Sequence, residues 1–316
     1  SVLDFSFGAP GPNFSTPGTG HNVAVNGNLT INGAAINPID AGGFGPGLYN
    51  LFTYGGTLSE TNGGIAPPAG FTIQNLTASK QINLINTNSL ALNFWNANGL
   101  ANSTRMGGGS GTWSAAQANW TDATGSVTST RQPADAFAIF GGDAGTVTVD
   151  GNGGAQPVTA LGMQFANDGF HLVGDALGLV APSPGALSEI RVGDGSAASA
   201  GWVATVDNTL TGLGFNKTGA GTLILGGANT YTQGTMLSAG TLSVSADTNL
   251  GAASAGLDFE GGTLQVTGTS FQSTPRAITF GATGGGFDIA DAANVFTVSQ
   301  PLSGTGSLTK LGAGTL

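Results

Sequence analysis

The tripeptide Gly-Thr-Leu returns at regular intervals near the end of the chain, and it constrains the fold more than any other feature. It begins at residues 221, 240 and 262, so that successive copies are 19 and 22 residues apart, and it occurs again at 314. A repeat of about 20 residues is typical of solenoids, in which each repeat packs only on its neighbours. The spacing therefore predicts that each copy belongs to one coil of a β-solenoid.

The residues that follow each copy alternate between apolar and polar. Leu223 and Leu225 fall on one face of the segment 221–225, and Leu242 and Val244 fall on the corresponding face of 240–244. Because side chains along a strand point to opposite faces in turn, stacked coils would set these residues in columns inside the solenoid. The pattern predicts an all-β chain folded as an elongated parallel β-helix.

Glycine supplies 56 of the 316 residues, while charged residues make up only 8%. Segments with helical apolar spacing are missing, because Gly and Asn interrupt the apolar runs. Solenoid corners need tight turns with positive φ, which Gly and Asn adopt at low cost. We interpret 226–229 and 247–252 as such corners, and Gly219 and Gly221 as points where coils press together. In the first hundred residues we predict strands at 22–25, 29–31, 49–54, 81–85 and 90–95.

The charge balance excludes some classes of partner. The formal net charge is −10, from 17 acidic and 7 basic residues, and the basic residues are scattered along the chain. Without a basic patch, the chain is not expected to bind nucleic acid or anionic lipid. Cysteine is absent, which excludes disulfides and thiolate metal ligands.

Catalytic residues would have to come from two histidines and a few carboxylates. The nucleophile motif G-x-S-x-G is absent, and we interpret His21 as a loop residue and His171 as a strand residue without a catalytic role. Glu60, Glu189 and Glu260 stand isolated in sequence, and Asp143, Asp150, Asp175 and Asp194 mostly adjoin glycines in turns. We predict no catalytic residue. Stacked coils could still align several carboxylates in a groove, as a polysaccharide-degrading β-helical enzyme requires.

Four further patterns are candidates for binding sites. The loop at 150–153 lacks the Glu that completes an EF-hand, and 284–292 has no second copy to form a stacked calcium repeat. Gly-Ala-Gly at 219–221 opens a strand, whereas a phosphate loop precedes a helix. Trp95, Trp113 and Trp120 could line a sugar-binding surface, but we predict that they fill the interior. We expect no cofactor and no metal.

The segment from 217 to 251, KTGAGTLILGGANTYTQGTMLSAGTLSVSADTNLG, resembles the passenger-associated strand repeat of bacterial autotransporters. The usual phrase of that family begins Lys-x-Gly-x-Gly-Thr-Leu-x-Leu, continues through Asn-Thr-Tyr and ends on a second Gly-Thr-Leu. Gln233 departs from it, since Gly is usual there. The residues that we assign to the structural repeat are Lys217, Gly219, Gly221, Thr222, Leu223, Leu225, Asn229, Tyr231, Gly240, Thr241, Leu242, Gly262, Thr263, Leu264, Lys310, Gly312 and Gly314.

The resemblance covers about two thirds of the chain and implies both fold and location. It implies a right-handed parallel β-helix that a C-terminal translocator β-barrel exports by type V secretion, with the passenger at the bacterial surface, at the outer membrane or secreted. Because KLGAGTL breaks off at Leu316, we expect further coils and the barrel beyond it. We divide the chain into an N-terminal β-rich region or cap with the first coils (1–100), middle coils (101–213) and repeat-bearing coils (214–316).

The function that the resemblance implies is a non-enzymatic β-helical stalk or adhesin. Its expected partners are a receptor on a host cell, in the matrix or on a glycan, or another copy of the chain in an assembly. The alternatives are a polysaccharide-degrading enzyme on the same fold, and an inert spacer or filament subunit.

Overall fold

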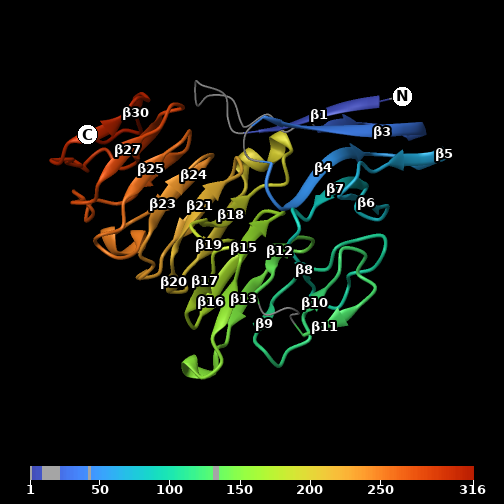
Figure 1. Ribbon diagram of the computed structural model, residues 1–316, viewed down its shortest axis with the longest axis horizontal. Helices are drawn as coiled ribbons and strands as arrows, with labels where there is room; N and C mark the ends of the chain where they lie inside the picture. Colours follow the sequence, from blue (N-terminus) through green and yellow to red (C-terminus); the bar gives the residue numbers. More distant parts are fainter. Residues whose placement is uncertain (1, 9–21, 42–43, 131–134) are drawn as a thin grey trace.

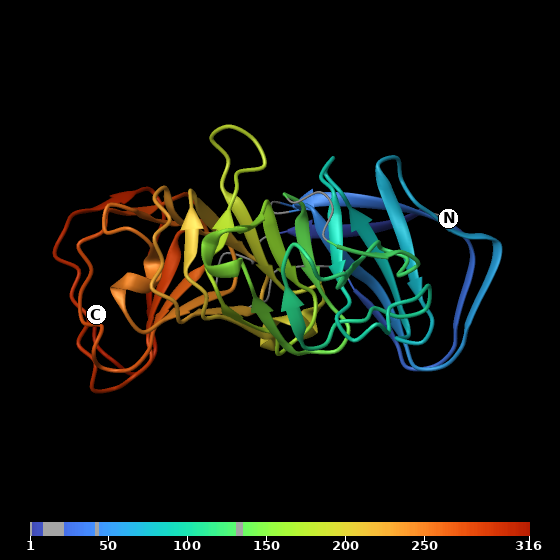
Figure 2. The same cartoon turned by 90° about the horizontal axis from the view of Figure 1, so that it is seen from below.

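The computed structural model describes residues 2–8, 22–41, 44–130 and 135–316. The described chain is elongated, with its N-terminal and C-terminal parts at opposite ends (Figures 1 and 2). Strands dominate, and the helices of the described residues are the short 3-10 helices η1 (Asn152–Gly154), η2 (Ala197–Gly201) and η3 (Asp247–Leu250). None of the described helices combines the length and hydropathy needed to cross a membrane.

Two long sheets build the larger part of the molecule. The eleven-stranded sheet runs in spatial order through β11 (Thr128–Ser129), β10 (Trp120–Thr121), β8 (Leu92–Trp95), β12 (Phe137–Phe140), β15 (Gly162–Phe165), β18 (Ser188–Val192), β21 (Gly214–Thr218), β23 (Gly234–Leu237), β25 (Leu257–Phe259), β27 (Ile278–Phe280) and β29 (Leu302–Gly304). All neighbouring strands from β8 to β29 pair in parallel. At the other edge, β10 pairs with β8 and with β11 in antiparallel fashion.

The nine-stranded sheet follows the same coils. It contains β9 (Gly111–Trp113), β13 (Thr146–Val149), β16 (His171–Gly174), β19 (Val203–Val206), β22 (Thr222–Leu225), β24 (Thr241–Val244), β26 (Thr263–Val266), β28 (Gly285–Ile289) and β30 (Leu308–Leu311). A short third sheet holds β14 (Val158–Ala160), β17 (Leu177–Leu179) and β20 (Leu210–Gly212). From β12 onward the chain visits the two long sheets in turn, once per coil, which confirms the predicted parallel β-helix.

The apolar side chains of successive coils stack in register inside the helix. Leu223 of β22 pairs with Leu242 of β24, which in turn pairs with Leu264 of β26. Leu225 and Val244 form the start of a second column, and all five side chains are at most 1% exposed. Each coil thus buries its apolar face only by stacking on its neighbours, which is the energetic basis of a solenoid.

The N-terminal part forms two further sheets outside the helix. One contains β2 (Val23–Val25), β4 (Gly47–Tyr54), β7 (Gln81–Asn86) and β6 (Phe71–Leu76), with antiparallel pairing of β7 to both of its neighbours. The other contains three parallel strands, β1 (Val2–Gly8), β3 (Leu29–Ala41) and β5 (Leu58–Ala66). These sheets enclose a separate apolar cluster that includes Phe5, Leu51 and Ile82.

The outer face of the first coils is covered by this N-terminal part. Ala138 and Phe140 of β12 point into the β-helix core. The alternate residues Phe137 and Ile139 are equally buried, but they pack on the outside in a cluster that includes Leu48 of β4. A strand with both faces buried reads as a continuous apolar run, as Phe137–Phe140 does. The N-terminal part is therefore packed against the side of the helix.

Candidate functional site at the junction of the N-terminal sheet and the β-helix

The lysine that opens the repeat holds the backbone of two successive coils. Lys217 lies at the end of β21 with its side chain fully buried, and its Nζ donates to the carbonyl oxygens of Thr218 at 2.9 Å and Gly219 at 3.0 Å. A third bond, of 3.1 Å, reaches the carbonyl of Ala239 on the next coil. The amine of Lys217 thus contacts three backbone carbonyls on two successive coils.

The second copy of the phrase builds the same corner at another place on the coil. Nζ of Lys310 donates to the carbonyls of Leu311 and Gly312, both at 2.7 Å. Gly312 has φ 73°, the value that Gly219 has in the first copy. Yet Lys310 lies in β30 of the nine-stranded sheet, whereas Lys217 lies in the eleven-stranded sheet. The phrase therefore encodes a local turn and does not mark one fixed side of the helix.

The buried amine should make stability depend on pH above neutrality. Burial lowers the pKa of Lys217 from 10.5 to about 7, and the charge of Arg191 acts in the same direction. Between pH 7 and 10 the unfolded chain keeps a proton that the folded chain has lost, so the free energy of unfolding should rise by up to about 1.4 kcal/mol per pH unit. Burial raises the pKa of Tyr49 and Tyr231, so stability should fall again above pH 10, where the unfolded chain loses their protons first.

Urea unfolding at a series of pH values measures this profile. The variant Lys217→Met should lose the rise between pH 7 and 10 and keep the fall above pH 10. An unchanged rise in that variant would assign the proton to another group.

The other repeat residues lie in the coil interior or at its corners. Tyr231 is fully buried, and its hydroxyl lies 2.7 Å from that of Thr235. The side chain of Asn229 accepts the Leu210 N–H at 2.7 Å and donates to a carbonyl of the next coil, as an internal corner asparagine. In the column of repeat threonines, Thr222 pairs with Thr241 and Thr241 with Thr263. Gly221, Gly262 and Gly314 donate backbone hydrogen bonds to neighbouring coils.

His171 and Asp175 make their polar contacts with neighbouring coils. His171 Nε2 lies 2.6 Å from Asp207 Oδ2 on an exposed surface, and His21 lies outside the described residues. Asp175 accepts the N–H groups of Gly151 and Gly153 on the preceding coil, so its carboxylate joins two coils. In the part of the chain that the structure describes, no three His, Asp or Glu side chains gather so that they could hold a metal ion.

The three tryptophans singled out from the sequence fill the core. Trp95, Trp113 and Trp120 are at most 1% exposed, and their rings contact one another edge to face with centroids about 5 Å apart. The indole N–H of Trp95 donates to the carbonyl of Gly109 at 2.7 Å. The prediction of an interior role is confirmed.

A buried glutamine joins the N-terminal sheet to the helix. The side chain of Gln164, on the outer face of β15, accepts the Leu48 N–H and donates to the Leu48 carbonyl, both at 2.7 Å. It also donates to the carbonyl of Gly193 at 2.9 Å. Sequence reasoning missed Gln164, although a glutamine within the apolar run Gly162–Phe165 is a signal of a buried polar contact.

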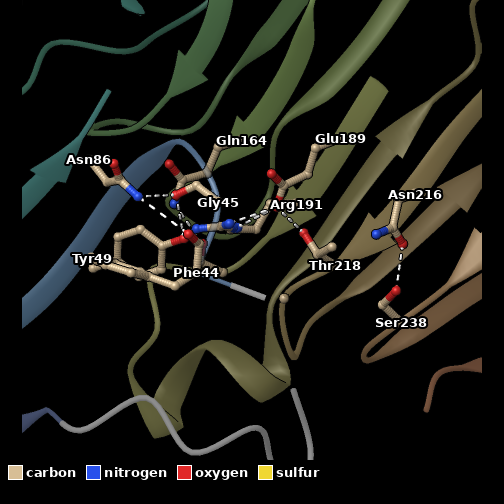
Figure 3. Close-up of polar contacts among 12 residues, drawn as sticks. Phe44, Gly45, Tyr49, Asn86, Gln164, Glu189, Arg191, Asn216, Thr218 and Ser238 are labelled. Atoms are coloured by element: carbon tan, nitrogen blue, oxygen red, sulfur yellow. Dashed lines mark hydrogen bonds and ion pairs between the residues drawn. The ribbon is translucent and has the colours of Figure 1, made fainter. Parts of the chain in front are cut away.

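Near Gln164, the buried guanidinium of Arg191 packs against the ring of Tyr49. Arg191 of β18 donates to Glu189 Oε1 at 2.6 Å, and its guanidinium lies 4.5 Å from the centroid of the Tyr49 ring (Figure 3). Thr218 donates to the same carboxylate oxygen at 2.5 Å. The Glu189 carboxylate thus joins Arg191 of its own strand to Thr218 of the next coil, and Arg191 in turn lies under Tyr49 of the N-terminal sheet. A one-dimensional pattern does not show which strands become neighbours.

A cleft opens next to this junction. Its volume is about 330 Å³, and its walls come from β4, β6, the first coils and the segment after η2. The polar side chains in the wall are Ser79, Gln81, Arg105, Asp143, Asn167 and Asp194, and the larger apolar ones are Leu48, Leu76, Met106 and Trp202. The cleft exists only where the N-terminal sheet and the helix meet.

Two carboxylates in the cleft each have one occupied oxygen. Arg105 and Asn98 both donate to Asp143 Oδ2, at 3.1 and 3.0 Å. The backbone N–H and the hydroxyl of Ser196 both donate to Asp194 Oδ1, at 2.9 and 2.6 Å. Burial raises the pKa of Asp194, although the hydrogen bonds from Ser196 oppose the shift. Among the described residues, no hydrogen bond reaches the second oxygen of either carboxylate.

The fold and its corner repeat define the class of passenger β-helices, and comparison with known proteins agrees. Residues 215–244 match the Passenger-associated-transport-repeat family. The chain is 44% identical, over 289 residues, to the adhesin BmaC autotransporter of Brucella suis biovar 1 (strain 1330), an alignment that covers 89% of this chain and 8% of that protein. No solved structure matches. The chain is thus an autotransporter passenger segment, as its repeat implied, and this class is displayed at the outer membrane or secreted.

Proposed function

We propose that this chain is a non-enzymatic, adhesive segment of an autotransporter passenger. The observation that carries the proposal is its 44% identity to a segment of a protein named as an adhesin. The chain spans 8% of the length of that relative. The repeat-bearing coils form a rod, and the N-terminal sheets at the other end of the molecule supply a less repetitive surface (Figure 2). The cleft lies where these sheets meet the first coils.

The division of labour that we propose follows the three parts expected from the sequence. Residues 1–100 and the first coils of 101–213 present the contact surface, and 214–316 act as the stalk. The partner is a receptor on another cell or in the matrix, and in the full-length protein a translocator domain exports the passenger.

Bead adhesion tests this function directly. Beads coated with the purified chain should attach to cultured animal cells, or to surfaces coated with matrix protein, several-fold more often than albumin-coated beads. Soluble chain added in excess should compete with the beads for the receptor. Attachment equal to that of albumin would instead leave the inert spacer as the function of this segment.

A further inference from the structure

We propose that the cleft between the N-terminal sheet and the β-helix binds a neutral, hydroxyl-rich sugar, such as the terminal unit of a glycan. The inference rests on the adhesive function proposed above and names the chemistry of its receptor. The volume of about 330 Å³ lies at the lower end of the range for small-molecule sites, about 300–1,000 Å³. A site of this size suits the end of a glycan.

One part of the wall is suited to the C–H face of a sugar ring. Trp202 is half-buried and lines the cleft, whereas the other three of the four tryptophans are sealed in the core. Leu48, Leu76 and Met106 line the same cleft. A pyranose ring presents apolar C–H groups on one face, and aromatic side chains with one apolar and one wet side are suited to pack on it. Trp202 is therefore the proposed stacking residue.

The other part of the wall is suited to the hydroxyls at the rim of the ring. Each sugar hydroxyl both donates and accepts, so a site for neighbouring hydroxyls needs both kinds of group. Asp143 and Asp194 offer carboxylate oxygens with no partner among the described residues, and Arg105, Gln81 and Asn167 carry N–H donors. Asp143 has the largest expected share, because its side chain is 56% exposed whereas Asp194 is 3% exposed, and hydrogen bonds to charged groups are the strong ones.

The charge of the cleft selects a neutral sugar over an acidic one. Two carboxylates line the cleft, and Arg105 alone among its side chains carries a fixed positive charge. The Arg105 guanidinium is already paired with Asp143 at 3.1 Å. With a formal net charge of −10 on the chain, sialylated or sulfated glycans would be repelled both locally and at a distance. Asp194 is 3% exposed, so its position in the wall is fixed by the surrounding structure.

An array of neutral, sialylated and sulfated glycans, probed with the whole chain, tests the proposal. Binding should appear on neutral glycans, and Asp143→Asn should weaken it about tenfold or more, as expected for the loss of a charge-assisted hydrogen bond. Trp202→Phe should weaken it as well, because it shortens the stacking surface. The matched control Asp258→Asn changes a half-buried aspartate of β25, far along the helix, and should bind like the unchanged chain. Circular dichroism of each variant verifies that the fold is retained.

Each other outcome overturns the proposal at an identifiable step. Binding only to sialylated or sulfated glycans would refute the neutral class, and binding that survives both cleft substitutions would place the sugar elsewhere. No bound glycan at all would refute a sugar site. The bead assay distinguishes this failure from a failure of the adhesive function. If beads attach while no glycan on the array is bound, the chain adheres through another surface. If beads do not attach, the proposed adhesive function is refuted.

Discussion

Replacing Arg276 with alanine should lower the free energy of unfolding by about 3–5 kcal/mol, because it removes a buried cation that holds several backbone carbonyls and the partly exposed carboxylate of Asp247. The side chain is 1% exposed, and its guanidinium donates to the carboxylate of Asp247 at 3.0 Å. It also donates to carbonyls of the corner that begins with η3, among them those of Leu250 at 2.8 Å and Gly251 at 2.9 Å. Alanine would leave these acceptors buried without a donor.

The matched control is Arg105→Ala, which also removes an arginine from a pair with an aspartate. The side chains of Arg105 and Asp143 are 34% and 56% exposed, so water replaces the lost partner and the cost should stay within about 1 kcal/mol. Urea unfolding followed by far-ultraviolet circular dichroism measures both variants. Equal losses would mean that Arg276 contributes no more than a surface pair.

The repetitive coils could be predicted from the sequence because their determinants are local. The alternation in 221–225 and the 19-residue step to 240 suffice to place Leu223 over Leu242, and the pairing has that register. The alternation of a strand and the residues of a repeated turn both depend on residues that are close together in the sequence. The phrase that begins at Lys217 returns at Lys310 with the same turn, but on the other long sheet. The local sequence thus defines the conformation of this turn. The number of residues between its two copies determines which of the two long sheets the turn follows.

The N-terminal part was less predictable because its contacts are remote in sequence. A strand was predicted at 29–31, whereas β3 extends from Leu29 to Ala41 between two other long strands. The bonds between Leu48 and Gln164 join residues 116 positions apart. No periodic pattern in the sequence predicts that Leu48 and Gln164 are neighbours. A polar residue in an apolar run indicates only that it has a buried hydrogen-bond partner. Trp202 was equally hidden, since it looks like an ordinary strand residue until the cleft beside it is seen.

A second large effect is expected for Gly240→Ala, at the start of the second Gly-Thr-Leu. Gly240 has φ 61°, and an added Cβ would overlap the carbonyl oxygens of Gly219 and Gly221 on the preceding coil. Alanine in this left-handed conformation costs about 1–2 kcal/mol, and separating packed groups costs about 1–3 kcal/mol more. We expect unfolding to become easier by about 2–5 kcal/mol in total.

The control variant Gly153→Ala measures how much of the lost free energy of unfolding comes from placing alanine in a left-handed backbone conformation. Gly153 has the same φ of 61°, but an added Cβ would meet nothing within 4 Å. It should therefore lose only the backbone cost of about 1–2 kcal/mol. The difference between the two variants in urea unfolding measures how closely the coils are pressed together at the repeat. Equal losses would show that these glycines serve the turn alone. A larger loss at Gly240 would show that the repeat needs glycine because one coil lies against the backbone of the next.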